Sequence, residues 1–163
     1  MGESNETTRA GLSESEMREN FLSLVFQEDP VRFETFLALL TEALPADVAA
    51  VIRGSSVTGR RWEDGAPFDA DGAGTSDIDL TLVGSAVIEW FLPHGFYIAD
   101  VHSKPLCEKD PDIAPTLVPL RDKLTAIAGR PVNIQATRNW VMFFREYLMG
   151  QPYLTLIGKV ETP

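Results

Sequence analysis

The sequence contains only one cysteine, Cys107, and no hydrophobic run long enough to cross a bilayer. A single cysteine excludes an internal disulfide and a zinc site built from several cysteines, so a reducing environment is expected. The opening stretch, MGESNETTRAGLSESE, also lacks the apolar segment of a signal peptide. We therefore expect a cytoplasmic protein without a membrane association.

Basic residues are scarce as well. The chain has 14 Lys and Arg against 24 Asp and Glu, and its formal net charge is −10. Proteins that grip long nucleic acids through the phosphates normally present a basic face, so this composition argues against such a partner. A small nucleotide that arrives with its own Mg²⁺, or a protein partner, is compatible with an acidic chain.

The length of 163 residues and the hydrophobic content of 44% are ordinary for one globular domain with a proper core. The first residues are polar and show no periodicity, which predicts a disordered tail over residues 1–12. The remaining residues, 13–163, are expected to form a single domain.

Hydrophobic periodicity predicts both helices and strands in this domain. The expected helices cover residues 14–27, 30–44, 85–91, 115–128 and 140–149. The expected strands cover residues 48–52, 77–83, 96–98 and 132–135, and residues 153–157 form either an edge strand or a tail. The order predicts an α/β or α+β fold in which helices flank a small mixed sheet.

Residues 51–83 hold the most informative pattern of the chain. Asp77 and Asp79 are two positions apart on an expected strand, so both carboxylates should project from one face. Upstream, Gly54 is followed by Ser55 and Ser56, a turn that lets a ligand approach the backbone closely. Two adjacent carboxylates suit a Mg²⁺ ion that also binds the phosphates of a nucleotide.

The same residues carry a family resemblance. Gly54-Ser55, followed by Ser76-Asp77-Ile78-Asp79-Leu80, resembles the signature of the nucleotidyltransferase fold, the polymerase-β-like superfamily. The resemblance covers residues 31–148. It implies that the Gly-Ser turn holds a nucleoside triphosphate and that the two aspartates bind the catalytic Mg²⁺. The predicted nucleotide-binding residues are Gly54, Ser55, Ser56, Ser76 and Lys104.

The sequence departs from the family pattern at two points. The segment between the turn and the aspartates is longer than usual. The family also has a third metal carboxylate on a later strand, and the corresponding position here is Asn133, which carries no charge and cannot act as a base. Asp100 is the other candidate for a third acid.

Two further segments are candidates for ligand contacts. Residues 59–75 form a polar insert in which Arg60 and Arg61 either meet phosphates or pair with the insert's own acids. The expected loop over residues 99–115 is dense in polar groups, and His102 and Lys104 are its candidates for substrate contact. The alternative for both is a solvated loop.

These observations lead to three hypotheses. The first is a Mg²⁺-dependent nucleotidyltransferase that moves a nucleoside monophosphate from a nucleoside triphosphate to an unknown acceptor hydroxyl. The second is a catalytically weakened module on the same fold that binds a nucleotide or a protein partner, as in a toxin–antitoxin-like pair. Asn133 favours the second. The third treats Asp77 and Asp79 as polar strand residues without a ligand.

Overall fold

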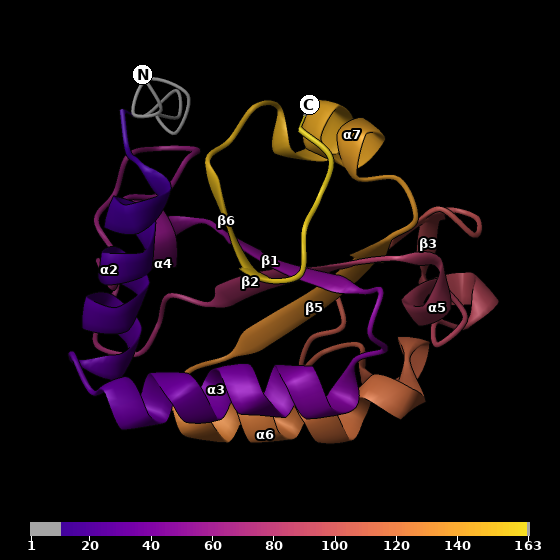
Figure 1. The fold of residues 1–163 in the computed structure, drawn as a ribbon, viewed down its shortest axis with the longest axis horizontal. Coiled ribbons are helices and arrows are strands. Elements are labelled where there is room, and N and C mark those ends of the chain that lie inside the picture. Colours follow the sequence, from indigo (N-terminus) through magenta and orange to yellow (C-terminus); the bar gives the residue numbers. More distant parts are fainter. Residues whose placement is uncertain (1–10, 163) are drawn as a thin grey trace.

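A computed structural model describes residues 11–162, so the predicted tail lies almost entirely outside the described residues. Within them, a single six-stranded sheet runs through the middle of the protein (Figure 1). Its strand order is β3-β4-β5-β2-β1-β6. The strands are β1 Ala49–Arg53, β2 Ile78–Val83, β3 Phe96–Ile98, β4 His102–Ser103, β5 Val132–Thr137 and β6 Tyr153–Ile157.

The sheet is mixed, as predicted. β2 and β5 run parallel, whereas β1 pairs antiparallel with both β2 and β6, and β4 pairs antiparallel with both β3 and β5. The uncertain segment 153–157 is an edge strand beside β1. β4 was not predicted, because a two-residue strand inside a polar segment has no periodicity to detect; it is defined by pairing of His102 with Thr137 and Ile98.

The helices of the described residues lie at the predicted positions, although several are shorter, except for the four-residue helix Ser55–Thr58, which was not predicted. Their bounds are α2 Glu14–Phe26, α3 Pro30–Ala43, α4 Ser55–Thr58, α5 Ser85–Ile88, α6 Val118–Ala128 and α7 Trp140–Phe143. Ser13 and Glu16 form a reciprocal capping box at the start of α2, and Asp29 caps α3. Short 3₁₀ turns occupy Pro93–Gly95, Pro111–Ile113 and Pro115–Leu117. None of the described helices is long and apolar enough to span a bilayer.

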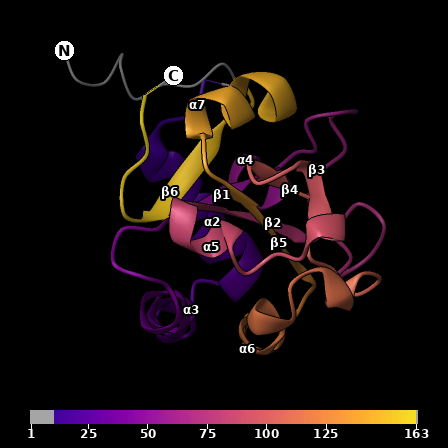
Figure 2. The ribbon, with the colours of Figure 1, turned by 90° about the vertical axis from the view of Figure 1, so that its right-hand side faces the viewer.

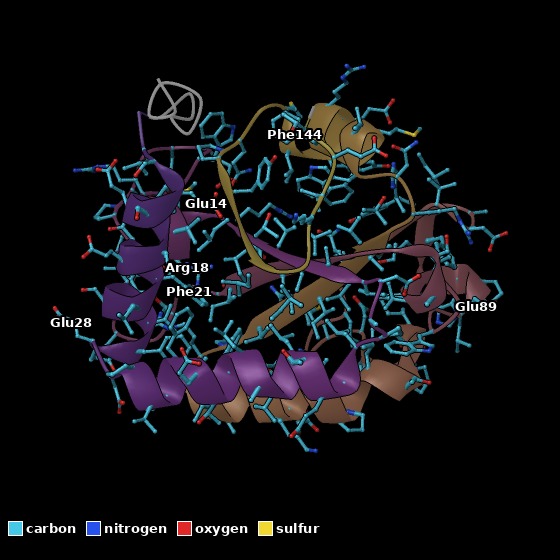
Figure 3. All side chains as sticks on the ribbon, viewed as in Figure 1. Glu14, Arg18, Phe21, Glu28, Glu89 and Phe144 are labelled. Atoms are coloured by element: carbon cyan, nitrogen blue, oxygen red, sulfur yellow. The ribbon has the colours of Figure 1, made fainter. Side chains whose placement is uncertain are left out.

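The main hydrophobic core fills one face of the sheet. There α3 and α6 lie side by side, and α2 stands against α4 near the β6 edge (Figures 1 and 2). Four phenylalanines of α2 and α3 pack edge to face and close this core: Phe21, Phe26, Phe33 and Phe36. Figure 3 shows Phe21 on the inner side of α2, whereas Glu28 points away from the protein just beyond the end of that helix.

A second, smaller cluster lies on the opposite face of the sheet, where α7 packs (Figures 1 and 2). It joins Val51 of β1 to Trp140, Phe143 and Leu148. The helix predicted over residues 140–149 is interrupted here, because α7 continues as a π-helical turn, Phe144–Leu148. This cluster covers only part of the face. The neighbouring part carries polar side chains, and these form the candidate site.

Candidate functional site

Three neighbouring strands bring Arg53, Asp79 and Asn133 into one row across the sheet. Antiparallel pairing of β1 with β2 sets Arg53 opposite Asp79, and parallel pairing of β2 with β5 sets Asp79 opposite Asn133. Paired residues project to the same side of a sheet. That side faces away from the main core, because the adjacent Leu80 and Ile134 are buried in the core.

A cavity of about 150 Å³ opens over this row. Three consecutive segments line it, namely the turn after β1, the insert and the start of β2, together with Gln151, which lies far from them in the sequence. The lining residues include Gly54, Ser55, Ser76, Asp77, Asp79, Arg53, Arg61, Trp62, Glu63 and Gln151. The structure therefore gathers most of the predicted site residues around one polar hollow.

The Gly-Ser turn lies directly against the carboxylates. Gly54 has φ 93° and ψ −167°, a conformation open essentially to glycine alone. A Cβ added there would lie 3.4 Å from Oδ2 of Asp79, so the missing side chain leaves room beside that carboxylate. Ser55 lines the cavity, whereas Ser56 is fully buried, does not line it, and has a hydroxyl without a hydrogen-bond partner among the described residues.

Gly54→Ala is expected to lower the free energy of unfolding by about 2 kcal/mol, because alanine is strained at this φ and ψ. The new methyl group should also lower the affinity for any ligand that binds between the turn and Asp79. Gly129→Ala is the matched control: its φ of 69° carries a smaller penalty of about 1 kcal/mol, and its Cβ meets nothing closer than 4.0 Å. Urea denaturation would measure both variants, and equal stability of Gly54→Ala and wild type would contradict this account of the turn.

The two carboxylates have different surroundings. Asp77 is exposed at the cavity rim, and its Oδ2 accepts a 2.7 Å hydrogen bond from the amide Nδ2 of Asn133. The side chain of Asp79 is 37% exposed. Burial raises the pKa of Asp79; the charge of Arg53 opposes this rise, and the charge of Asp77 adds to it. A cation in the cavity would favour the ionised form of both acids.

Arg53 is held beside these acids by its own contacts. Its Nη1 lies 3.9 Å from Oδ2 of Asp79, and its Nη2 donates a 3.0 Å hydrogen bond to Oε1 of Gln135. Its Nε is buried without a hydrogen-bond partner among the described residues. The guanidinium is therefore a fixed positive charge at the floor of the cavity.

The insert is ordered by backbone and side-chain contacts. Arg60 pairs with Pro67 in an isolated β-bridge, and the backbone N–H of Arg61 donates to the carbonyl of Ala66. Arg61 also forms ion pairs with Asp64 and Asp71. Of the two predicted alternatives for the arginines, the structure shows Arg61 pairing with the insert's own acids. Arg61 nevertheless lines the cavity, together with the neighbouring Trp62 and Glu63.

One buried ion pair fixes the insert to the sheet. Arg130, which precedes β5, donates to both carboxylate oxygens of Asp69 at 2.7 and 3.2 Å and to the carbonyl of Ser76 at 3.1 Å. Its guanidinium also lies 4.4 Å from the ring centroid of Phe68. Burial raises the pKa of Asp69, but hydrogen bonds from Arg130, Ser76 and Gly74 lower it to about 2. Asp69 therefore stays ionised and positions the start of β2.

Two other sequence candidates lie away from the cavity. Lys104 is exposed and does not line it. His102 is fully buried: its Nδ1 lies 2.7 Å from the hydroxyl of Thr137, and its ring meets Phe143 and Tyr147 edge to face. The expectation of a substrate contact is therefore wrong for His102, because β4 turns this side chain into the protein interior.

Acidification should reveal the buried state of His102. Burial lowers its pKa below 6.5, against opposing effects of the Val101 backbone and the charge of Glu146. The unfolded chain then binds a proton that the folded protein does not, so the free energy of unfolding should fall as pH drops below 6.5, at a slope approaching about 1.4 kcal/mol per pH unit. In His102→Gln, urea denaturation between pH 7 and pH 5 should show a flatter slope; an unchanged slope would contradict the assignment.

Some residues that line the cavity were not predicted from the sequence. Arg53 could have been found by alternation, since it shares the face of Val51 two positions earlier. Trp62 and Glu63 carry no local signal, because their approach to the carboxylates depends on how the insert folds back. Gln151 follows the π-helical turn, and no periodicity marks it.

Comparison of the chain with protein-family models, with curated proteins and with solved structures finds no match to any of them. Among the described residues, no group of three or more His, Cys, Asp or Glu side chains is arranged to hold a metal ion. The chemistry of the site therefore rests on the carboxylate pair, the Gly-Ser turn and their neighbours.

Proposed function

We propose that the cavity binds a Mg²⁺–nucleoside triphosphate and that the protein transfers the nucleoside monophosphate to an acceptor hydroxyl. The observation that carries this proposal is the position of Gly54 and Ser55 against Asp79, with Asp77 on the rim of the same cavity. A carboxylate pair beside a turn without a side chain provides ligands for a divalent cation and space for phosphate oxygens.

The donor set fits Mg²⁺ bound together with its nucleotide. Such an ion is usually held by one or two carboxylates, with phosphates and water completing the shell. Asp77 and Asp79 supply those carboxylates. When bound, the cation would neutralise charge on the transferred phosphoryl group and on the leaving pyrophosphate.

The remaining residues act on the triphosphate and its surroundings. Ser55 and Ser76 line the cavity and offer hydroxyl groups to phosphate oxygens. Arg53 supplies a fixed positive charge on the cavity floor. In the transfer, the acceptor oxygen bonds to the α-phosphorus, pyrophosphate leaves, and the hydroxyl proton passes to water, because Asn133 cannot accept it.

A second function is favoured by one observation. The amide of Asn133 donates to Asp77 at the position where the resemblance implies a third carboxylate. An amide cannot remove a proton from an acceptor, so the site also suits a module that binds a nucleotide, or a partner, without turnover. This is the toxin–antitoxin-like alternative.

Two measurements made in parallel distinguish the two functions: the transfer of label from a labelled nucleotide, and the melting temperature of the protein. The protein is incubated with labelled ATP, CTP, GTP and UTP, Mg²⁺ and cell lysate, and the label is traced to RNA, protein or small molecules. An enzyme should release pyrophosphate, and Asp77→Ala should abolish the release, whereas the exposed Asp122→Ala should not. A binding module should show nucleotide-dependent stabilisation without release. No melting shift with any Mg²⁺–nucleotide would refute both the enzyme and the nucleotide-binding module, and would leave only a module that binds a protein partner.

A further inference from the structure

The contacts of the two carboxylates limit how many cations the site can hold. Oδ2 of Asp77 accepts the hydrogen bond from Asn133, and Oδ2 of Asp79 faces Arg53 at 3.9 Å and the space of the missing Gly54 side chain. Oδ2 of each acid thus already faces a protein donor, and the space left by Gly54 admits a ligand beside Asp79. A two-metal site instead needs carboxylates that serve two ions about 3.5–4 Å apart.

The row across the sheet contains a positive group that can replace the charge of a second metal ion. Arg53, Asp79 and Asn133 occupy paired positions on three adjacent strands, so one cation, one anion and one neutral amide stand in line. The side chain of Arg53 is only 22% exposed and is fixed at its far end by Gln135. A guanidinium stays protonated at any physiological pH, so this charge is permanent.

We propose that the site takes a single divalent cation with its nucleotide and that the guanidinium of Arg53 serves as the second positive charge. This inference rests on the proposed function, since it concerns the same cavity. It follows from two features of the described residues. Among them, no group of three acids is arranged to hold a metal ion, although Glu63 also lines the cavity, and the half-buried Arg53 stands beside the pair with an Nε that has no hydrogen-bond partner. Arg53 is thus a positioning residue for Asp79 and an electrostatic contact for phosphate oxygens.

Cation stoichiometry tests the inference without relying on turnover. Mn²⁺ is titrated into the protein in the presence of a non-hydrolysable nucleoside triphosphate analogue, and free Mn²⁺ is followed by electron paramagnetic resonance. We expect one Mn²⁺ per chain. Two Mn²⁺ per chain would overturn the inference while leaving the proposed function standing. No binding of Mn²⁺ or analogue would overturn both.

Arginine variants test the role of the charge. Arg53→Gln should weaken analogue binding about tenfold, whereas Arg53→Lys, which keeps the charge, should stay within about threefold of wild type. Arg145→Gln, at an exposed position on the π-helical turn, gives the same change in net charge and should bind like wild type. Melting curves of each variant report whether it is folded. Equal weakening in the Gln and Lys variants, or none in either, would show that the Arg53 charge has no such role.

Discussion

Replacing Asp79 with asparagine is expected to raise the melting temperature of the protein and to weaken the proposed binding of Mg²⁺–nucleotide. The raised pKa of Asp79 means that its ionised form is disfavoured in the fold, chiefly by burial and further by the charge of Asp77. Asparagine removes that cost at pH 7. Because the side chain is 37% exposed, the gain should be only about 1 kcal/mol, or about 3 °C.

The same change removes one of the two carboxylates available to the cation. We expect nucleotide affinity to fall at least about 100-fold, because a charge-assisted contact is replaced by a weak amide ligand. Differential scanning fluorimetry with and without Mg²⁺–nucleotide measures both effects in one experiment. Asp122→Asn, on the exposed side of α6, is the control and should change neither.

Two results would contradict this account. A lower melting temperature in Asp79→Asn would mean that the carboxylate stabilises the fold, in which case Arg53 outweighs burial. Unchanged nucleotide binding would mean that the ligand lies elsewhere. The pH dependence has the opposite sign to that of His102: for a carboxyl with a raised pKa, the cost is present above the folded pKa and disappears as pH falls through it.

Arg130→Met should produce the largest loss of stability, about 3 kcal/mol. The substitution leaves the carboxylate of Asp69 without its partner and removes the hydrogen bond to the carbonyl of Ser76. The guanidinium contact with the ring of Phe68 is also lost. Because this ion pair joins the insert to the start of β2, ligand affinity should fall as well, through looser placement of the residues on the insert.

Acid unfolding supplies an independent measurement for the same pair. Asp69 has a pKa of about 2 in the fold against 3.8 in the unfolded chain, so its stabilisation, about 2 kcal/mol, is complete above pH 4 and is lost as pH falls to 2. Arg130→Met should lose part of this dependence in urea titrations at pH 5 and pH 2.5, because the backbone N–H groups of Ser76 and Gly74 still donate to Asp69 in the variant. Arg138→Met, at an exposed position, should retain it. An Arg130 variant with wild-type stability at pH 5 would show that the ion pair contributes nothing.

Local patterns predicted most of the elements because those signals act over a few residues. Ser13 and Glu16 cap α2, Asp29 and Pro30 start α3, and Gly129 ends α6 in the left-handed conformation, all from short-range chemistry. The elements that differ lack such signals. β4 needs a partner strand to exist, and the π-helical turn after Phe143 arises where aromatic rings pack on the sheet.

For the site, strand alternation alone predicted that Asp77 and Asp79 share a face. The family resemblance, and not the spacing, linked them to Gly54. Alternation also predicted the later strand, and the resemblance singled out Asn133 on it. The distance between those groups, however, depends on pairings between residues far apart in the chain. The amide of Asn133 reaches Asp77 only because β5 lies parallel to β2 in that register.

The sequence by itself therefore determined the carboxylate pair, the glycine turn and the helices and strands that carry them, since each follows from the order of neighbouring residues. Tertiary structure alone decided that Arg53 stands beside Asp79, that the insert brings Trp62 and Glu63 over the cavity, and that His102 is buried. The physical reason is that charge, burial and contact depend on which strands pair and which loops fold back. Packing of the whole hydrophobic core determines these strand pairings and loop positions.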